Sequence, residues 1–138
     1  MHVILVDNGR TSLLHSEYKE ILKCINCGAC LSICPVFHAI GAKYGFEHKG
    51  GRGITLQRYQ KGLKELFKKA FYCTTCSACK EVCPAGIDLP KLIRNLRSEL
   101  HSNGLQTQKN LEMIKNVITG GDTFGGKEMD SSVEFYCC

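Results

Sequence analysis

The chain has 138 residues, enough for one small domain with a thin hydrophobic core. Its formal net charge of +5 counts ten cysteines as neutral thiols. The first residues lack the pattern of a signal peptide, so none is expected, and no apolar run approaches the roughly eighteen residues of a membrane span. We therefore expect a cytoplasmic protein without a transmembrane segment, a compartment in which clustered cysteines favour metal over disulfides.

The N-terminal part of the chain predicts a short strand followed by a helix. Residues 2–6 (HVILV) have the composition of a strand, and a turn signal ending at Gly9 follows them. A helix is expected to begin near Thr11 or Ser12 and to run as far as Cys24. Its apolar face would consist of Leu14, Tyr18, Ile21 and Leu22.

The middle of the chain predicts an irregular loop and two further helices. Residues 36–53 contain five glycines and are expected to form the loop. A helix is expected over 54–70, where apolar residues recur at helical spacing. Asp88 is the expected N-cap of the next helix, with Pro90 in its first turn and Asn103 near its end. Its apolar face would consist of Leu89, Leu92, Ile93, Leu96 and Leu100.

The C-terminal part predicts one more helix, over about 106–118, and then an irregular glycine-rich tail that ends in Cys137 and Cys138. We interpret the two terminal cysteines as exposed thiols. The expected organisation is an N-terminal docking segment, a two-cluster domain and a C-terminal helix with its tail, over residues 1–10, 11–104 and 105–138.

An internal repeat is the strongest feature of the sequence. The motif C-x₂-C-x₂-C-x₃-C-P occurs twice, and every cysteine of the first copy recurs 49 residues later. The first copy is Cys24, Cys27, Cys30 and Cys34, and the second is Cys73, Cys76, Cys79 and Cys83. Pro35 and Pro84 repeat at the same offset.

This spacing predicts two [4Fe–4S] clusters. Three closely spaced cysteines cover three irons of a cubane, and in two-cluster ferredoxins the fourth cysteine of each motif binds the other cluster. Structural zinc sites are the alternative, but a third cysteine at this spacing and a fourth before proline exceed what zinc needs. The expected ligand sets are Cys24, Cys27, Cys30 and Cys83 for one cluster, and Cys73, Cys76, Cys79 and Cys34 for the other.

The bound clusters change the meaning of the net charge. An oxidised cluster with its four thiolates carries about −2, so two of them bring the formal +5 close to +1. The raw charge therefore does not imply a nucleic-acid partner. Basic residues between Arg58 and Lys69 are interpreted as a solvated helix face.

The stretches 3–41 and 71–100 resemble the iron–sulfur segment of lactate-utilisation protein B. Two sequence motifs are typical of that group, VDNGR and CGACLSICPVF. The second stretch also resembles the C subunits of heterodisulfide reductase and of anaerobic glycerol-3-phosphate dehydrogenase. The resemblance implies a mainly α fold, an α-helical ferredoxin with two cluster-binding loops, and it maps all eight ligand positions onto cysteines.

Two classes of function follow from these observations. The sequence has no nucleotide fingerprint and no acid–base constellation, so no catalytic residue is assigned. We expect an electron-transfer subunit whose partners are catalytic subunits of an oxidoreductase, with a flavin or a cysteine-rich domain. The alternative is a free-standing ferredoxin. An oxygen-sensing regulator would need an effector module, and none is visible.

Overall fold

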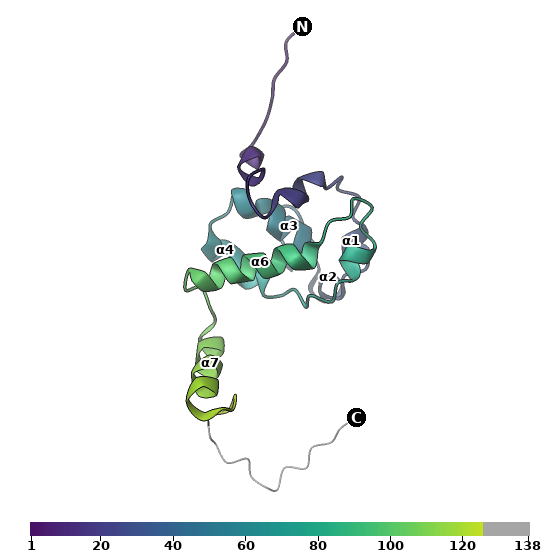
Figure 1. The fold of residues 1–138 in the computed structure, drawn as a ribbon. Coiled ribbons are helices and arrows are strands. Elements are labelled where there is room, and N and C mark those ends of the chain that lie inside the picture. Colours follow the sequence, from purple (N-terminus) through teal and green to yellow (C-terminus); the bar gives the residue numbers. More distant parts are fainter. Residues whose placement is uncertain (126–138) are drawn as a thin grey trace. The chain divides into compact units, whose positions relative to one another are not determined.

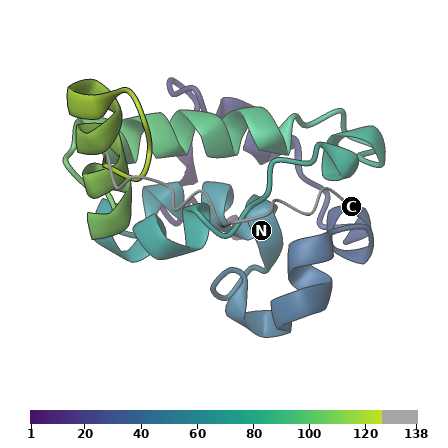
Figure 2. The ribbon, with the colours of Figure 1, turned by 90° about the horizontal axis from the view of Figure 1, so that it is seen from below.

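The long helix α6, Leu89–Ser102, organises the first part of the chain. We describe the fold from a computed structural model, which describes residues 1–125. The structure divides into two compact units, Met1–Leu105 and the part from Gln106 onward. Figures 1 and 2 show α6 beside α3 (Gly50–Leu56) and α4 (Leu63–Ala70), which pack against it.

Local sequence explains why α6 forms where it does. The Asp88 carboxylate accepts a hydrogen bond from the Lys91 N–H at 3.0 Å, and Pro90 lies in the first turn. Asn103 is the C-cap. The predicted apolar face is confirmed, because all five of its residues are buried: Leu89, Leu92, Ile93, Leu96 and Leu100.

The remaining elements are short. They are the 3₁₀ helices η1 (Arg10–Leu13), η2 (Lys19–Lys23), η3 (Gly41–Lys43) and η4 (Gln57–Tyr59), and the α-helices α1 (Ala29–Ser32), α2 (Pro35–Ile40), α5 (Ala78–Glu81) and α7 (Gln108–Gly120).

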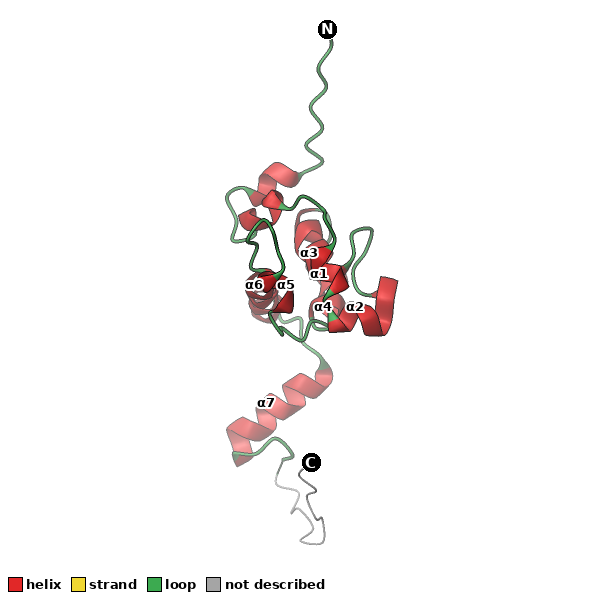
Figure 3. Cartoon of the chain, turned by 90° about the vertical axis from the view of Figure 1, so that its right-hand side faces the viewer, coloured by secondary structure: helices red, strands yellow, loops and turns green. Residues whose placement is uncertain are grey.

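The mainly α prediction is confirmed, but the N-terminal strand is wrong. Figure 3 shows helices and loops, and the described residues contain only one isolated β-bridge, between Gly45 and Lys49. Residues 2–6 have no regular secondary structure, and the side chains of Ile4 and Leu5 are 85% and 91% exposed. A strand needs a neighbour for its backbone groups, and no described segment supplies one.

The single helix expected from Thr11 to Cys24 is also corrected. The structure has η1 and η2 with a turn between them. The Ser16 hydroxyl donates to the Leu13 carbonyl at 2.8 Å and accepts from the Tyr18 N–H at 3.1 Å. Because this side chain bonds the local backbone itself, it replaces helical hydrogen bonds.

The expected loop at 36–53 contains more helix than predicted, and the expected helix at 54–70 is interrupted. The Cys34 sulfur accepts from the Phe37 N–H and caps α2. Helix α3 begins at Gly50 and packs closely against the preceding turn. A Cβ on Gly53 would lie 1.9 Å from the His48 carbonyl oxygen, so only glycine fits there. Helix α4 starts anew after Gly62, whose backbone is extended.

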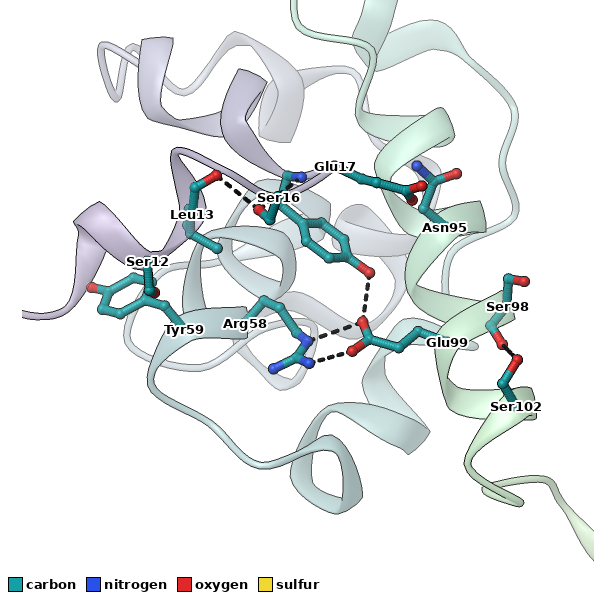
Figure 4. A pocket seen from close by; sticks show the side chains of 11 residues that line it. Ser12, Leu13, Ser16, Glu17, Arg58, Tyr59, Asn95, Ser98, Glu99 and Ser102 are labelled. Atoms are coloured by element: carbon teal, nitrogen blue, oxygen red, sulfur yellow. Dashed lines mark hydrogen bonds and ion pairs between the residues drawn. The ribbon is translucent and has the colours of Figure 1, made fainter.

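A network of polar side chains links the N-terminal helices to α6. The Glu99 carboxylate accepts from the Tyr18 hydroxyl at 2.8 Å and from the Arg58 Nε at 3.0 Å (Figure 4). Arg58 lowers the pKa of Glu99, whereas burial raises the pKa of Tyr18. An open pocket of about 750 Å³ surrounds this network, and no cysteine lines it. The network therefore stabilises the fold.

The second unit contains α7, whose observed bounds lie two residues beyond the expected 106–118. The Thr107 hydroxyl caps it by accepting from the Asn110 N–H at 3.2 Å, and Gly121 ends it in a left-handed conformation. Cys137 and Cys138 lie outside the described residues. No helix among residues 1–125 is long and apolar enough to cross a membrane. The segment boundaries expected at residues 10 and 104 stay predictions.

Candidate metal centre

The two cysteine motifs form loops of the same backbone shape. The first loop leads into α1 and the second into α5, and these two helices pack against each other (Figure 3). Positive φ angles recur at equivalent positions. Asn26 (61°) matches Thr75 (54°), and Gly28 (82°) matches Ser77 (68°). Left-handed residues at these positions turn backbone N–H groups toward one side of the loop, an arrangement suited to anionic ligands.

One cavity joins the first loop to the end of the second motif. Its lining includes Cys24, Cys27 and Cys30 together with Cys83, which is distant in sequence. Ile21, Ile87 and Leu89 add an apolar wall, and Arg52 of α3 completes the lining. We call this cavity site A.

A second cavity has the matching composition. Its lining includes Cys73, Cys76 and Cys79 together with Cys34 from the first motif. Cys30 also reaches it, and α3 and α6 contribute Gly51, Leu89, Pro90 and Ile93. We call this cavity site B, defined by Cys34, Cys73, Cys76 and Cys79. The structure therefore brings the fourth cysteine of each motif to the first three of the other motif.

Backbone N–H groups point at several of the sulfurs. Cys34 Sγ accepts from the Phe37 N–H at 3.5 Å, and Cys83 Sγ accepts from the Ile87 N–H at 3.4 Å. Cys73 Sγ accepts from the Thr75 N–H at 3.4 Å. Such N–H···S bonds stabilise negative charge on thiolate sulfur and tune the potential of a bound cluster.

A buried cation faces site A. Arg52 is 8% exposed, and its Nη1 donates to Cys24 Sγ at 4.0 Å. Its buried Nε has no hydrogen-bond partner among the described residues. An isolated buried charge is costly unless an opposite charge is close. A cluster with four thiolates carries negative charge, so the residues of site A fit an anionic iron–sulfur group.

Burial raises the pKa of one cysteine in each loop. Burial raises the pKa of Cys79 to about 12, and the surrounding cysteines raise it further. Burial also raises the pKa of Cys30, the equivalent residue of the first loop, but there Arg52 acts in the opposite direction. A metal must displace these protons, so cluster binding is coupled to proton release.

All eight motif cysteines are free thiols. Within residues 1–125, no three His, Cys, Asp or Glu side chains converge closely enough to hold a single metal ion. A cubane does not need that convergence, because each of its four cysteines binds a different iron.

Two residues at the sites, Arg52 and Tyr44, were not predicted from the sequence. Both lie in the stretch 36–53, where the density of glycine suggested only a loop. The Tyr44 side chain is 1% exposed and lines the wall of site B. Burial, together with the adjacent Cys73 sulfur that its hydroxyl contacts, raises its pKa. A lone arginine inside GGRG could have signalled that the glycines serve close packing of a buried helix.

Comparisons with known proteins agree with this geometry. Residues 20–87 match the family described as the 4Fe-4S dicluster domain. The chain is 36% identical over 115 residues to the uncharacterized electron transport protein YkgF of Escherichia coli, an alignment that covers 83% of this chain and 24% of YkgF.

Relatives named lactate utilization protein B match a shorter part of the chain. Those of Bacillus cytotoxicus and Bacillus thuringiensis are each 45% identical over 56 residues, which is 40% of this chain and 12% of theirs. The chain thus spans about a quarter or less of the length of these relatives. Residues 20–87, which include the cysteines of both sites, thus match the 4Fe-4S dicluster domain family, and the chain is similar to YkgF and to lactate utilization protein B.

Proposed function

We propose that this protein is an electron relay with two [4Fe–4S] clusters, working within a multi-subunit oxidoreductase of the lactate-utilisation or heterodisulfide reductase type. The observation that carries the proposal is the convergence of four cysteines at each of two adjacent cavities. A [4Fe–4S] cluster, when bound, accepts and releases one electron at a time.

The ligands of the proposal follow the two cavities. Site A would hold one cluster, through Cys24, Cys27, Cys30 and Cys83. Site B would hold the other, through Cys73, Cys76, Cys79 and Cys34. The packing of α1 against α5 supports two clusters close enough for electron transfer between them.

The exposed cysteines of the two loops support electron exchange with partner proteins. Cys27 and Cys76 are the exposed cysteines of their loops, and Ile25 beside Cys24 is 69% exposed. The exposed apolar segment 2–6, which has no regular secondary structure in this chain, is a candidate docking segment for a partner. We expect that partner to be a catalytic subunit with a flavin or a cysteine-rich domain.

Crossed ligation is tested by a matched pair of variants. Cys83→Ala should damage the cluster of the 24–30 loop, and Cys34→Ala should damage the cluster of the 73–79 loop. Electron paramagnetic resonance of the anaerobically reduced proteins would show the loss of one signal in each, and the lost signal should differ between them. If Cys83→Ala removes the cluster of its own 73–79 loop, the crossing is wrong.

The relay role is tested by removing the docking segment. Deletion of residues 1–8 should leave the iron content unchanged but weaken co-purification with partner chains and substrate-linked turnover. The matched control is the double variant Lys64→Ala, Lys68→Ala, which alters two exposed lysines of α4. A monomer that exchanges electrons freely, with this segment dispensable, would favour the free-standing ferredoxin.

A further inference from the structure

The two sites repeat in cysteines and backbone shape but differ in the charge beside the sulfurs. The side chain that reaches a sulfur of site A is Arg52 of α3. The side chain at the corresponding wall of site B is Tyr44, which is uncharged and 1% exposed. Cysteines aside, Arg52 is the one residue with a charged side chain among the described residues that line the two cavities.

The charge of Arg52 has no carboxylate to balance it within the described residues. The ion pairs of that part of the chain involve Arg58, Lys61, Lys80 and Lys109 as the cations. Arg52 instead directs Nη1 at Cys24 Sγ, at 4.0 Å, from a position that is 8% exposed. The anion that balances it is therefore the content of site A.

The cations near site B are arranged differently. Arg97 is only half-buried, and its guanidinium donates to the backbone carbonyls of Ala70 and Cys73. It also stacks over the Phe71 ring at 5.2 Å. Lys80 of α5 is exposed and pairs with Asp88 at 3.0 Å. Solvent and these partners screen both charges, so they act on site B less than buried Arg52 acts on site A.

We propose that Arg52 makes site A the stronger electron acceptor of the two, so that electrons pass through the protein from site B to site A. The inference rests on the proposed two-cluster function. In this step one electron leaves the reduced cluster of site B, which becomes oxidised, and enters the oxidised cluster of site A, which becomes reduced. No proton moves, and the electron is supplied to site B by a reduced flavin of the partner.

The physical reason is the change of charge on reduction. Each added electron makes the cluster and its thiolates more negative by one charge, and a nearby buried cation stabilises that change. A neutral tyrosine hydroxyl donates a hydrogen bond but brings no net charge. Both loops have an exposed cysteine, Cys27 and Cys76, so access alone does not set the direction.

The test is a redox titration of the holoprotein followed by electron paramagnetic resonance. The wild-type protein should show two potentials, with site A the higher. Tyr44→Phe assigns the signals, because it should shift only the site B cluster. Arg52→Gln should lower the site A potential and change the distribution of the electron between the sites at least tenfold, which corresponds to 59 mV for one electron. Arg52→Lys should retain most of the difference.

The outcomes separate this inference from the proposed function. Iron and sulfide analysis of the same samples shows whether both clusters are present. If both are present and Arg52→Gln leaves the site A potential unchanged, the inference fails and the two-cluster function stands. If Arg52→Gln does not fold, the wild-type titration decides, since a site A potential equal to or below that of site B overturns the inference. A protein without iron would overturn both.

Discussion

At the scale of single residues, the left-handed positions of the two loops carry much of the site geometry. Ser77 occupies the place that Gly28 has in the first loop, and each has a positive φ angle. Glycine adopts this conformation freely, whereas a residue with a Cβ is strained there by roughly 1–2 kcal/mol. The same loop shape therefore costs more in the second motif than in the first.

This difference predicts opposite effects for two matched substitutions. Ser77→Gly should stabilise the holoprotein by about 1 kcal/mol, and Gly28→Ala should destabilise it by roughly 1–2 kcal/mol. A Cβ at residue 28 meets no atom within 4 Å, so backbone strain rather than a clash would be the cause. Anaerobic thermal unfolding of the iron-loaded variants measures both, and a less stable Ser77→Gly protein would contradict the account.

Single residues also differ in how far their place in the site could be predicted from the sequence. The eight cysteines were found from spacing alone, because the motif is local and repeated. Arg52 was not found, because nothing local shows that a charged residue in a glycine-rich stretch is buried. Its position depends on the packing of α3 against α6 and beside the sites, which is a tertiary property.

At the scale of elements, α6 supplies a large share of the hydrophobic core. Five of its apolar side chains are buried, and Leu96 is fully so. Leu96→Ala should destabilise the holoprotein by about 2–5 kcal/mol, because it leaves a cavity between packed helices.

A matched control is Leu111→Ala on α7, where Leu111 is 43% exposed. This change should alter stability by less than about 0.5 kcal/mol. Urea unfolding of both variants, followed by circular dichroism, measures the difference. Equal effects of the two substitutions would show that the buried face of α6 is not a main source of the protein's stability.

Elements also show where sequence-based prediction of the fold succeeded and failed. Helix α6 was predicted because its cap, its proline and its apolar period all lie within one stretch. The helix expected before Cys24 was wrong, since the Ser16 side chain replaces backbone hydrogen bonds. The strand at 2–6 was wrong because strand formation depends on a neighbour that no local pattern reveals.

At the scale of the whole molecule, we expect the fold and the clusters to depend on each other. Helices α1, α2 and α5, which flank the sites, have no fully buried residue. Six of the eight motif cysteines pack against the hydrophobic core. We therefore expect metal-binding energy to contribute to the folding energy of this protein.

Removal of the clusters should accordingly unfold much of the chain. Chelation or air oxidation should abolish most of the far-ultraviolet helical signal, and anaerobic reconstitution with iron and sulfide should restore it. Circular dichroism before and after each treatment measures this. An apo form with unchanged helicity and unchanged melting temperature would refute the dependence.

The central claim is that each of the two cavities holds a [4Fe–4S] cluster. The most direct test is the iron and labile sulfide content of the anaerobically purified chain, measured against protein concentration. The account predicts about eight iron and about eight sulfide per chain, with broad absorbance near roughly 400 nm. Two zinc ions per chain with neither iron nor sulfide would contradict it.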